Sequence, residues 1–138
     1  MNAQALFSST TIPVLEQVVD FAEARHNVLA GNLANLDTPG YRVRDLSESA
    51  FEKQLGEAIR RRDREPLTTS AGSNAVPRGN AMADVSDRVK GMVYHDESNV
   101  GLEQQVAEMA KNQVRHNTAL AILNSQFRLM GAAISERA

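Results

Sequence analysis

Residues recur with heptad spacing at both ends of this 138-residue chain, and this pattern constrains the fold more than any other feature. The N-terminal row consists of Ile12, Leu15, Val19, Ala22, His26, Leu29, Leu33 and Leu36. The C-terminal row consists of Leu102, Val106, Met109, Gln113, His116, Leu120, Leu123, Phe127, Met130 and Ile134. Alternating steps of three and four residues keep one stripe of a helix facing a partner helix. The pattern therefore predicts a long helix at each end of the chain, built to pack against other helices.

Composition favours helix seams over a large globular core, and it excludes several kinds of chemistry. Aromatic residues make up only 4% of the chain and Trp is absent, although aromatic side chains carry much of the buried area of compact cores. The absence of Cys excludes disulfides, thiolate chemistry and Cys-based zinc sites. The net charge of -2 gives no general attraction to nucleic acid or to an anionic membrane.

Targeting signals are not evident from the residue pattern. The first eleven residues have no basic n-region and no apolar h-region, so we expect no Sec-type signal peptide. No stretch approaches the roughly 18 consecutive apolar residues of a membrane span. The compartment stays open, because cytosolic and exported chains can both lack Cys.

The N-terminal helix is predicted over residues 11–36, with hydroxyl groups at Thr10 and Thr11 available as caps and Pro13 in the first turn. A second stripe lies beside the first, formed by Val14, Val18, Phe21, Arg25, Val28, Asn32 and Asn35. Together the stripes are wider than a simple helix pair requires. Two interpretations follow: contact with several neighbours in an assembly, which we favour, or coverage by the middle of the chain.

The predicted helix ends at a turn segment, residues 37–46. Pro39 followed by Gly40 is typical of a type II turn, because Gly accepts the positive φ of the third position. A short helix is predicted over residues 47–62, with Ser49 and Glu52 as a capping box and Arg60 to Arg62 at the end where cations complement the helix dipole.

The middle of the chain, residues 63–93, is predicted to be flexible, because residues 66–81 are rich in Ser, Thr, Gly, Asn and Pro. Residues 82–93 would suit a short helix or an extended segment equally. The C-terminal helix is predicted over residues 101–135. A second apolar row widens its last half, and it consists of Ala119, Ile122, Leu129 and Ala133.

The fold class that follows is all-α, with the long N- and C-terminal helices packing as an antiparallel coiled-coil pair, joined by a turn, a short helix and a flexible middle loop. In the register we predict, Leu36 lies beside Leu102. His26 then falls opposite Gln113 and His116, so that the polar breaks in the two seams coincide. Buried polar seam residues often fix register at a cost in stability.

Candidate catalytic and metal-binding residues are few. His95, Asp96 and Glu97 are adjacent in the chain, and adjacent residues converge poorly on one ion. His26 and His116 fit seam positions better than a metal site, although a two-histidine site between the helices stays open. The charges from Arg60 to Arg64 lack the interleaved aromatics of a nucleic-acid patch, and favour a solvated helix end or a patch for an acidic partner. We therefore expect no enzyme activity, metal or cofactor.

Residues 30–41, Ala-Gly-Asn-Leu-Ala-Asn-Leu-Asp-Thr-Pro-Gly-Tyr, resemble the N-terminal signature of the bacterial flagellar axial proteins, the rod, hook and hook-associated group. Two further blocks, residues 94–103 and 109–117, resemble the proximal-rod type of that group. The sequence departs from the pattern at Gly31, where the family commonly has Ser, and at Gly101, where an Asp usually caps the C-terminal helix.

This resemblance implies a structural subunit of the flagellar basal-body rod, exported by the flagellar type III apparatus without a cleaved signal and polymerising through its terminal helices. The implied partners are other copies of the chain, other rod and basal-body proteins and export-gate proteins, with no nucleic acid, no cofactor and no direct membrane span. The expected assembly interface comprises Leu29, Asn32, Leu33, Asn35, Leu36, Pro39, Gly40, Tyr41, Asn99, Val100, Leu102, Val106, Met109, Asn112, Leu120, Leu123, Phe127 and Met130.

The alternative to a rod subunit is a cytosolic helical adaptor or export-binding protein. Such a chain would form a folded dimer and stay in the cytoplasm. An enzyme would need convergent titratable groups, which the sequence does not offer.

Overall fold

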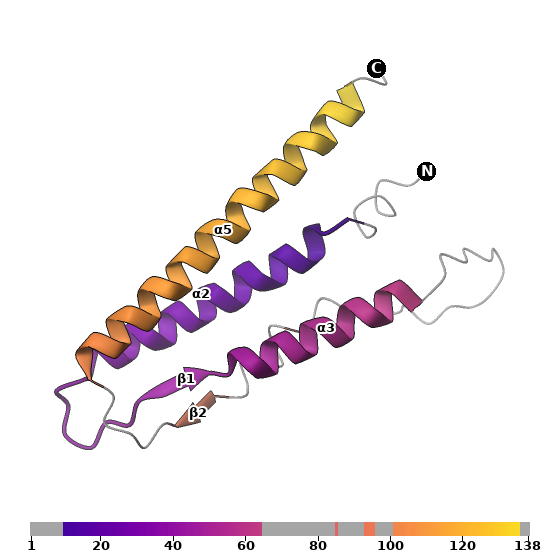
Figure 1. Cartoon of the computed structure of the whole chain (residues 1–138). Coiled ribbons are helices and arrows are strands. Elements are labelled where there is room, and N and C mark those ends of the chain that lie inside the picture. The colour runs from indigo at the N-terminus through magenta and orange to yellow at the C-terminus, as the bar shows by residue number, and fades with distance from the viewer. Residues whose placement is uncertain (1–9, 65–84, 86–92, 96–100, 136–138) are drawn as a thin grey trace, which may run out of the picture.

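The two long terminal helices run antiparallel, side by side, and a smaller layer covers the N-terminal one (Figure 1). The structure is a computed structural model that describes residues 10–64, 85, 93–95 and 101–135. Its elements in chain order are α2 (Ile12–Ala34), β1 (Arg44–Leu46), α3 (Glu48–Arg64), β2 (Val93–His95) and α5 (Leu102–Ser135). The predicted helical class and the antiparallel terminal pair are confirmed. Among the helices of these residues, none is long and apolar enough to cross a membrane.

Helix α2 begins and ends close to the predicted positions. Its first amide, Ile12 N, donates to the Thr10 hydroxyl at 3.3 Å, and Pro13 occupies the first turn. The helix ends at Ala34, two residues before the predicted end. The turn after it is the predicted type II turn, because Tyr41 N donates to Thr38 O at 3.1 Å and Gly40 has a φ of 78°.

A two-stranded antiparallel ribbon follows the turn, and the sequence did not predict it. β1 pairs with β2 so that Arg44 lies opposite His95 and Leu46 lies opposite Val93. β1 falls in the segment predicted as a turn, and β2 spans the end of the segment that suited helix or extended chain equally. Asp96 and Glu97 lie outside the described residues, and His95 serves here as a backbone partner in the ribbon.

Helix α3 starts at Glu48, and its cap is Ser47 rather than Ser49. The Ser47 hydroxyl accepts a hydrogen bond from Ala50 N at 3.2 Å, which is the N-cap geometry. The predicted capping box of Ser49 and Glu52 is therefore wrong. Because β1 ends at Leu46, the chain turns into the helix two residues earlier than that box requires, and the Ser49 hydroxyl pairs with Ser47 at 3.1 Å.

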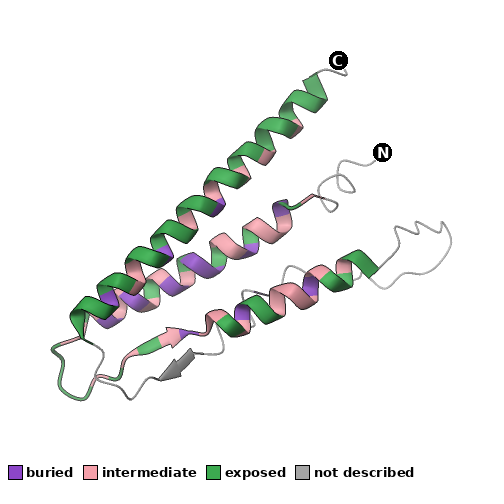
Figure 2. Cartoon of the chain, in the orientation of Figure 1, coloured by how far each residue is buried: buried purple, intermediate pink, exposed green. Residues whose placement is uncertain are grey.

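The hydrophobic core lies between α2 and α3. Its buried members are Phe21, Leu46, Phe51, Ala58 and Val85, and the partly buried Val14, Val18, Ala24, Val28, Leu55 and Ile59 pack against them. The Phe21 and Phe51 rings stack with centroids 4.1 Å apart. The second stripe of α2 is therefore covered by the middle of the chain, as Figure 2 shows by the purple and pink residues along α2. The interpretation we favoured, contact of this stripe with neighbouring subunits, is wrong for the folded chain.

Polar side chains set the register between α2 and α5. Asn112 Nδ2 donates to Ala22 O at 2.7 Å, and Arg25 Nη2 lies 3.1 Å from Glu108 Oε2. Gln113, predicted to lie opposite His26, is exposed. The buried residues of α5 are Gln105, Asn112 and Ala119, a heptad row one position away from the predicted Val106, Gln113 and Leu120. The predicted seam is thus rotated, because the hydrogen-bonding amides rather than the largest apolar side chains face α2.

Candidate functional site

The structure divides the expected assembly residues into those used by the fold and those left at the surface. Buried are Leu29, Asn32 and Asn112; half-buried are Leu33, Asn35, Leu36, Tyr41, Met109, Leu120, Leu123 and Met130. Exposed are Pro39, Gly40, Leu102, Val106 and Phe127. Asn99 and Val100 lie outside the described residues. Only part of the expected interface is therefore accessible to another protein in this conformation.

The surface of α5 carries exposed apolar side chains along its whole length. Leu102, Val106, Val114, Ile122, Phe127, Leu129 and Ile134 are each between 41% and 66% exposed. The last half of α5 extends beyond the start of α2 and is mostly exposed (Figure 2). Arg128 is the one charged residue between Asn117 and Ser135. We name the exposed apolar residues from Ile122 to Ile134 the α5 apolar surface.

Asn32 joins α2 to the turn, to β1 and to α5, and it has no capacity left for a partner. Its Nδ2 donates to Arg44 O at 2.6 Å and to Gln105 Oε1 at 3.2 Å. Its Oδ1 accepts from Arg44 N and from the Tyr41 hydroxyl, both at 3.1 Å. An amide side chain offers two donors and two acceptor positions, so all four are satisfied within the chain. Asn32 therefore acts in the fold, where its side chain is fully buried.

Arg25 forms the second link between the layers. Its Nη2 and Nε bind the two carboxylate oxygens of Asp45 at 2.7 and 2.9 Å, its Nη1 pairs with Glu48, and its Nη2 also contacts Glu108. The side chain is 4% exposed. Two exposed cations extend the network, since Arg115 pairs with Glu48 and Lys111 pairs with Glu108, each at 2.8 Å.

The charges of this cluster shift two pKa values. Burial alone would lower the pKa of Arg25, but the hydrogen bonds and charges of Asp45 and Glu108 outweigh it and raise that pKa above its ordinary value. The hydrogen bond from Lys111 is the largest influence on Glu108. Together with Arg25 it holds the pKa of Glu108 below its ordinary value, against the opposing effect of burial. Both shifts stabilise the charged forms and hence the ion pairs.

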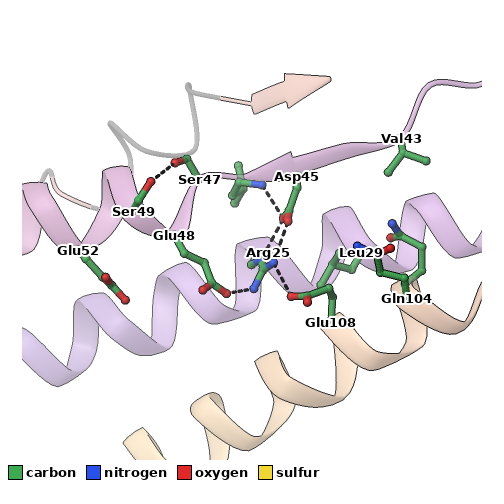
Figure 3. Close-up of a pocket in the computed structure, with 12 residues that line it drawn as sticks. Arg25, Leu29, Val43, Asp45, Ser47, Glu48, Ser49, Glu52, Gln104 and Glu108 are labelled. Carbon is green, nitrogen blue, oxygen red and sulfur yellow. Dashed lines mark hydrogen bonds and ion pairs between the residues drawn. The ribbon is translucent and has the colours of Figure 1, made fainter. Parts of the chain in front are cut away.

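The Arg25 cluster lines an open cavity of about 650 Å³ between α2, β1, α3 and α5 (Figure 3). It is lined by Arg25, Leu29, Val43, Asp45, Leu46, Ser47, Glu48, Ser49, Glu52, Gln104, Gln105 and Glu108. We name it the carboxylate cavity, after its four carboxylate side chains. Its serine hydroxyls form hydrogen bonds with each other and with the α3 backbone. The cavity therefore presents charged carboxylates rather than a serine nucleophile paired with a base.

The seam histidines do not form a shared site. His26 Nδ1 and His116 Nδ1 are both buried without a hydrogen-bond partner. Because Asn112 lies opposite Ala22, His116 lies one turn further toward the start of α2, whereas His26 lies one turn toward its end. Their backbone positions are thus offset by about two helical turns along the helix axis, roughly 11 Å. This register does not place the two histidines at the same level, so it does not favour the two-histidine site that the sequence leaves open.

Sequence analysis missed the Arg25 cluster and the role of Gln105. The sequence pattern places Arg25 in the second stripe of α2 without indicating a function for it. A signal was available, because a charged residue in an otherwise apolar stripe is seldom buried unless it is paired. Which carboxylates would pair with it was not evident, since Asp45 and Glu108 come from distant segments of the chain.

The comparisons with known proteins agree with these observations. The family model described as "Flagella basal body rod protein" matches residues 22–42, a stretch that includes Arg25, Asn32 and Gly40. The flagellar basal body rod protein FlgB of Bacillus subtilis is 28% identical over 126 residues, covering 89% of this chain and 91% of the relative. FlgB of Proteus mirabilis is 27% identical, covering 88% and 90%. FlgB of Aquifex aeolicus is 26% identical, covering 92% and 94%.

No solved structure matches the chain. The relatives match it along nearly its whole length, through both long helices and the segment between them. The predicted resemblance, based on residues 30–41, is confirmed by a model match over that stretch. Along nearly its whole length the chain is similar to flagellar basal body rod proteins of the FlgB type, and residues 22–42 match the model of the rod protein family.

Proposed function

We propose that this chain is a structural subunit of the bacterial flagellar basal-body rod, which polymerises through its terminal helices to build the drive shaft needed for motility. The observation that carries the proposal is the α5 apolar surface. Ile122, Phe127, Leu129 and Ile134 stand on a helix that extends past its intramolecular partner. The similarity to FlgB proteins gives this surface a context, since the matched relatives are rod proteins.

The physical argument rests on the area that α5 leaves in contact with water. Burying apolar surface stabilises an interface by about 25 cal/mol per Å², and contiguous exposed apolar patches mark interaction sites in soluble proteins. A helix with apolar side chains on two flanks can pack against more than one neighbouring helix. In a tubular assembly each copy of α5 would then contact helices of adjacent subunits.

The finer parts of the proposal concern location and partners. We place the subunit in the periplasm-spanning rod, exported without a cleaved signal peptide. Its partners would be other copies of itself, other rod and basal-body proteins, and export-gate proteins during export. The resemblance at residues 30–41 supports this.

A cytosolic adaptor is the less favoured function, because the matched relatives are rod proteins along nearly the whole chain. We propose no enzymatic role. The ionisable groups that converge in the described part of the chain, around Arg25, are engaged in ion pairs that link structural elements.

The test is quantitative mass spectrometry of basal bodies purified from the source cells. We expect the chain in the detergent-resistant rod fraction at several copies per structure. A strain that produces Leu129→Asp should contain the chain in its cells but lack it in basal bodies. Recovery of the wild-type chain only in the soluble cytosol would overturn the rod function and favour the adaptor.

A further inference from the structure

The arginines at the C-terminal end of α3 are mostly unused by the fold. Arg62 is engaged, since its Nη1 donates to Thr10 O at 3.0 Å and its Nε lies 3.3 Å from Asp63. Arg60, Arg61 and Arg64 are exposed and form no ion pair or hydrogen bond with any described residue. We name these three residues the basic end of α3. A favourable dipole interaction accounts for cations at this helix terminus, but not for three of them without a counter-ion among the described residues.

The opposite end of the same helix carries the opposite charge. The carboxylate cavity opens beside the first turns of α3, with Asp45, Glu48, Glu52 and Glu108 in its lining and Arg25 as the one cation among the lining residues. Glu52 takes no part in the Arg25 cluster, and Figure 3 shows it on the wall of the cavity, away from the dashed ion pairs. Glu48 and Glu108 also pair with Arg115 and Lys111, so the negative charge left unmatched among the described residues is that of Glu52.

We propose that the basic end of α3 docks into the carboxylate cavity of a second copy of this chain, head to tail. Arginine matches this role, because its planar guanidinium binds carboxylates with two parallel hydrogen bonds and stays charged at any physiological pH. The inference deepens the proposed function, on which the choice of a second copy as the partner rests. Charge complementarity between two ends of one helix is the observation that carries it.

The geometry of such a contact leads to a polymer rather than a closed dimer. The two complementary surfaces lie at opposite ends of a 17-residue helix, about 25 Å apart. A contact between two different patches of identical subunits leaves one of each patch free at the ends, so it continues into a ring or a filament. This contact would lie outside the α5 apolar surface and would join subunits through their outer layer.

The test uses the complete chain, which has no Cys of its own. We would introduce Ser49→Cys, in the cavity lining, together with Asp63→Cys, beside the basic end. These positions are about 21 Å apart on α3, too far for a disulfide within one chain. Mild oxidation is expected to give a ladder of dimers, trimers and higher species, whereas each single-Cys variant should stop at dimers.

Three controls make the ladder specific. Replacing the cavity position with Lys53→Cys, exposed on the same helix but outside the cavity lining, should remove the higher species. Salt at about 0.5 M should weaken the ladder, since exposed charges are screened. Arg60→Glu, Arg61→Glu and Arg64→Glu combined should weaken it by roughly tenfold, and adding Glu52→Lys should restore part of it. Unchanged ladders in salt and after charge reversal would overturn the inference.

Failure of this inference can be separated from failure of the rod function. If the triple Arg-to-Glu variant enters basal bodies at the wild-type copy number and the cells swim normally, the head-to-tail contact is wrong while the rod function stands. If the wild-type chain is absent from basal bodies, the rod function fails whatever the ladder shows. The triple variant should still unfold cooperatively, with a urea midpoint lowered only by the loss of the favourable dipole interactions, because the three arginines form no ion pair or hydrogen bond with any described residue.

Discussion

Helices α2 and α5 share the same heptad pattern but use it differently. Buried residues occur along the whole of α2, from Ile12 to Asn32, whereas the last buried residue of α5 is Ala119. On α2 one stripe faces α5 and the other faces α3 and the ribbon. On α5 one face contacts α2, and the remaining apolar side chains stay in water. A heptad pattern therefore predicts a helix that packs, but not whether its partner lies in the same chain.

The kind of side chain at each seam explains this difference. Polar groups with fixed partners, Arg25, Asn32 and Asn112, hold α2 to the elements around it. Past Ala119, α5 offers apolar side chains without such partners. Apolar contacts are non-directional, so this half of α5 can adapt to neighbouring subunits. Contacts within the chain therefore fix α2 and the elements packed around it, which we call the closed region. The part of α5 after Ala119, which we call the open region, stays available to other subunits.

The largest effect is expected from a charge on the open region. Leu129→Asp should abolish assembly into basal bodies and swimming, because a carboxylate would be buried without a partner in the subunit contact. The free energy of unfolding of the isolated chain should change by no more than about 0.5 kcal/mol, since Leu129 is 62% exposed. Swimming assays and urea unfolding measure the two effects. Normal swimming would show that the α5 apolar surface is not a subunit contact.

Two further variants sharpen the same test at half-buried seam positions. Leu33→Asp on α2 and Leu123→Asp on α5 should also prevent assembly, but both should destabilise the isolated chain as well, because these side chains are partly buried. Stability losses comparable to that of Leu129→Asp would contradict the division of the molecule into a closed and an open region.

In the closed region the largest loss is expected at Arg25. Arg25→Met removes the cation that neutralises Asp45, Glu48 and Glu108, and breaking a buried pair from one side costs about 3 to 5 kcal/mol. Chemical unfolding of the purified chain measures the loss. The matched control is Arg115→Met, which removes an exposed partner of Glu48 and should cost less than about 1 kcal/mol. Equal effects of the two substitutions would mean that burial of Arg25 does not matter.

Asn32 should follow in the same region. Asn32→Ala removes four hydrogen bonds and leaves the Gln105 amide and the Arg44 backbone short of partners, at a cost of about 2 to 3 kcal/mol. Thermal unfolding should show the change. Asn27→Ala, at an exposed position on the same helix, is the control and should be nearly neutral. Retention of wild-type stability in Asn32→Ala would exclude Asn32 as the link between the turn and α5.

Local features of this fold were predictable from the sequence, and non-local ones were not. The helices follow from heptad spacing, and the turn follows from Thr38, Pro39 and Gly40, because each signal lies within a few residues. The ribbon pairs Arg44 with His95 across about fifty residues, and three-residue strands carry no alternating pattern long enough to detect. The sequence leaves a fold-back of the middle segment open as the alternative for the second stripe of α2, and the core residues that form it come from separate elements.

The seam itself shows why the interface residues were only partly predictable. Choosing the row with the most apolar residues placed Val106 and Phe127 against α2, but the structure places Gln105 and Asn112 there instead. The predicted seam includes neither amide, and Asn112 enters the expected interface only through the family resemblance, yet both amides form hydrogen bonds with groups of α2. Buried polar groups that are hydrogen-bonded cost little, so Gln105 and Asn112 can occupy the buried row while Val106 and Phe127 stay exposed.

A smaller effect is expected at the turn between α2 and β1. Gly40→Val should cost about 1 to 2 kcal/mol, because a β-branched residue resists the φ of 78° although its Cβ would meet open space. Gly31→Ala, inside α2 and equally unobstructed, should instead be neutral or stabilising. Thermal unfolding of the two variants separates backbone strain from packing. If both variants behave alike, the positive φ at Gly40 is not maintained in solution.

The smallest effect is the dependence of the closed region on pH. The pKa of Glu108 is lower in the folded chain than its ordinary value of 4.5, so the unfolded chain binds the proton more readily. This carboxylate therefore contributes stability above pH 4.5, and the contribution is lost as the pH falls through the folded pKa. Unfolding free energies measured between pH 7 and pH 3 should fall less steeply for Glu108→Gln than for the wild type. Glu103→Gln, exposed on the first turn of α5, should leave the wild-type slope unchanged, and an equal change in both variants would mean that general charge, not the pairing with Lys111 and Arg25, determines the slope.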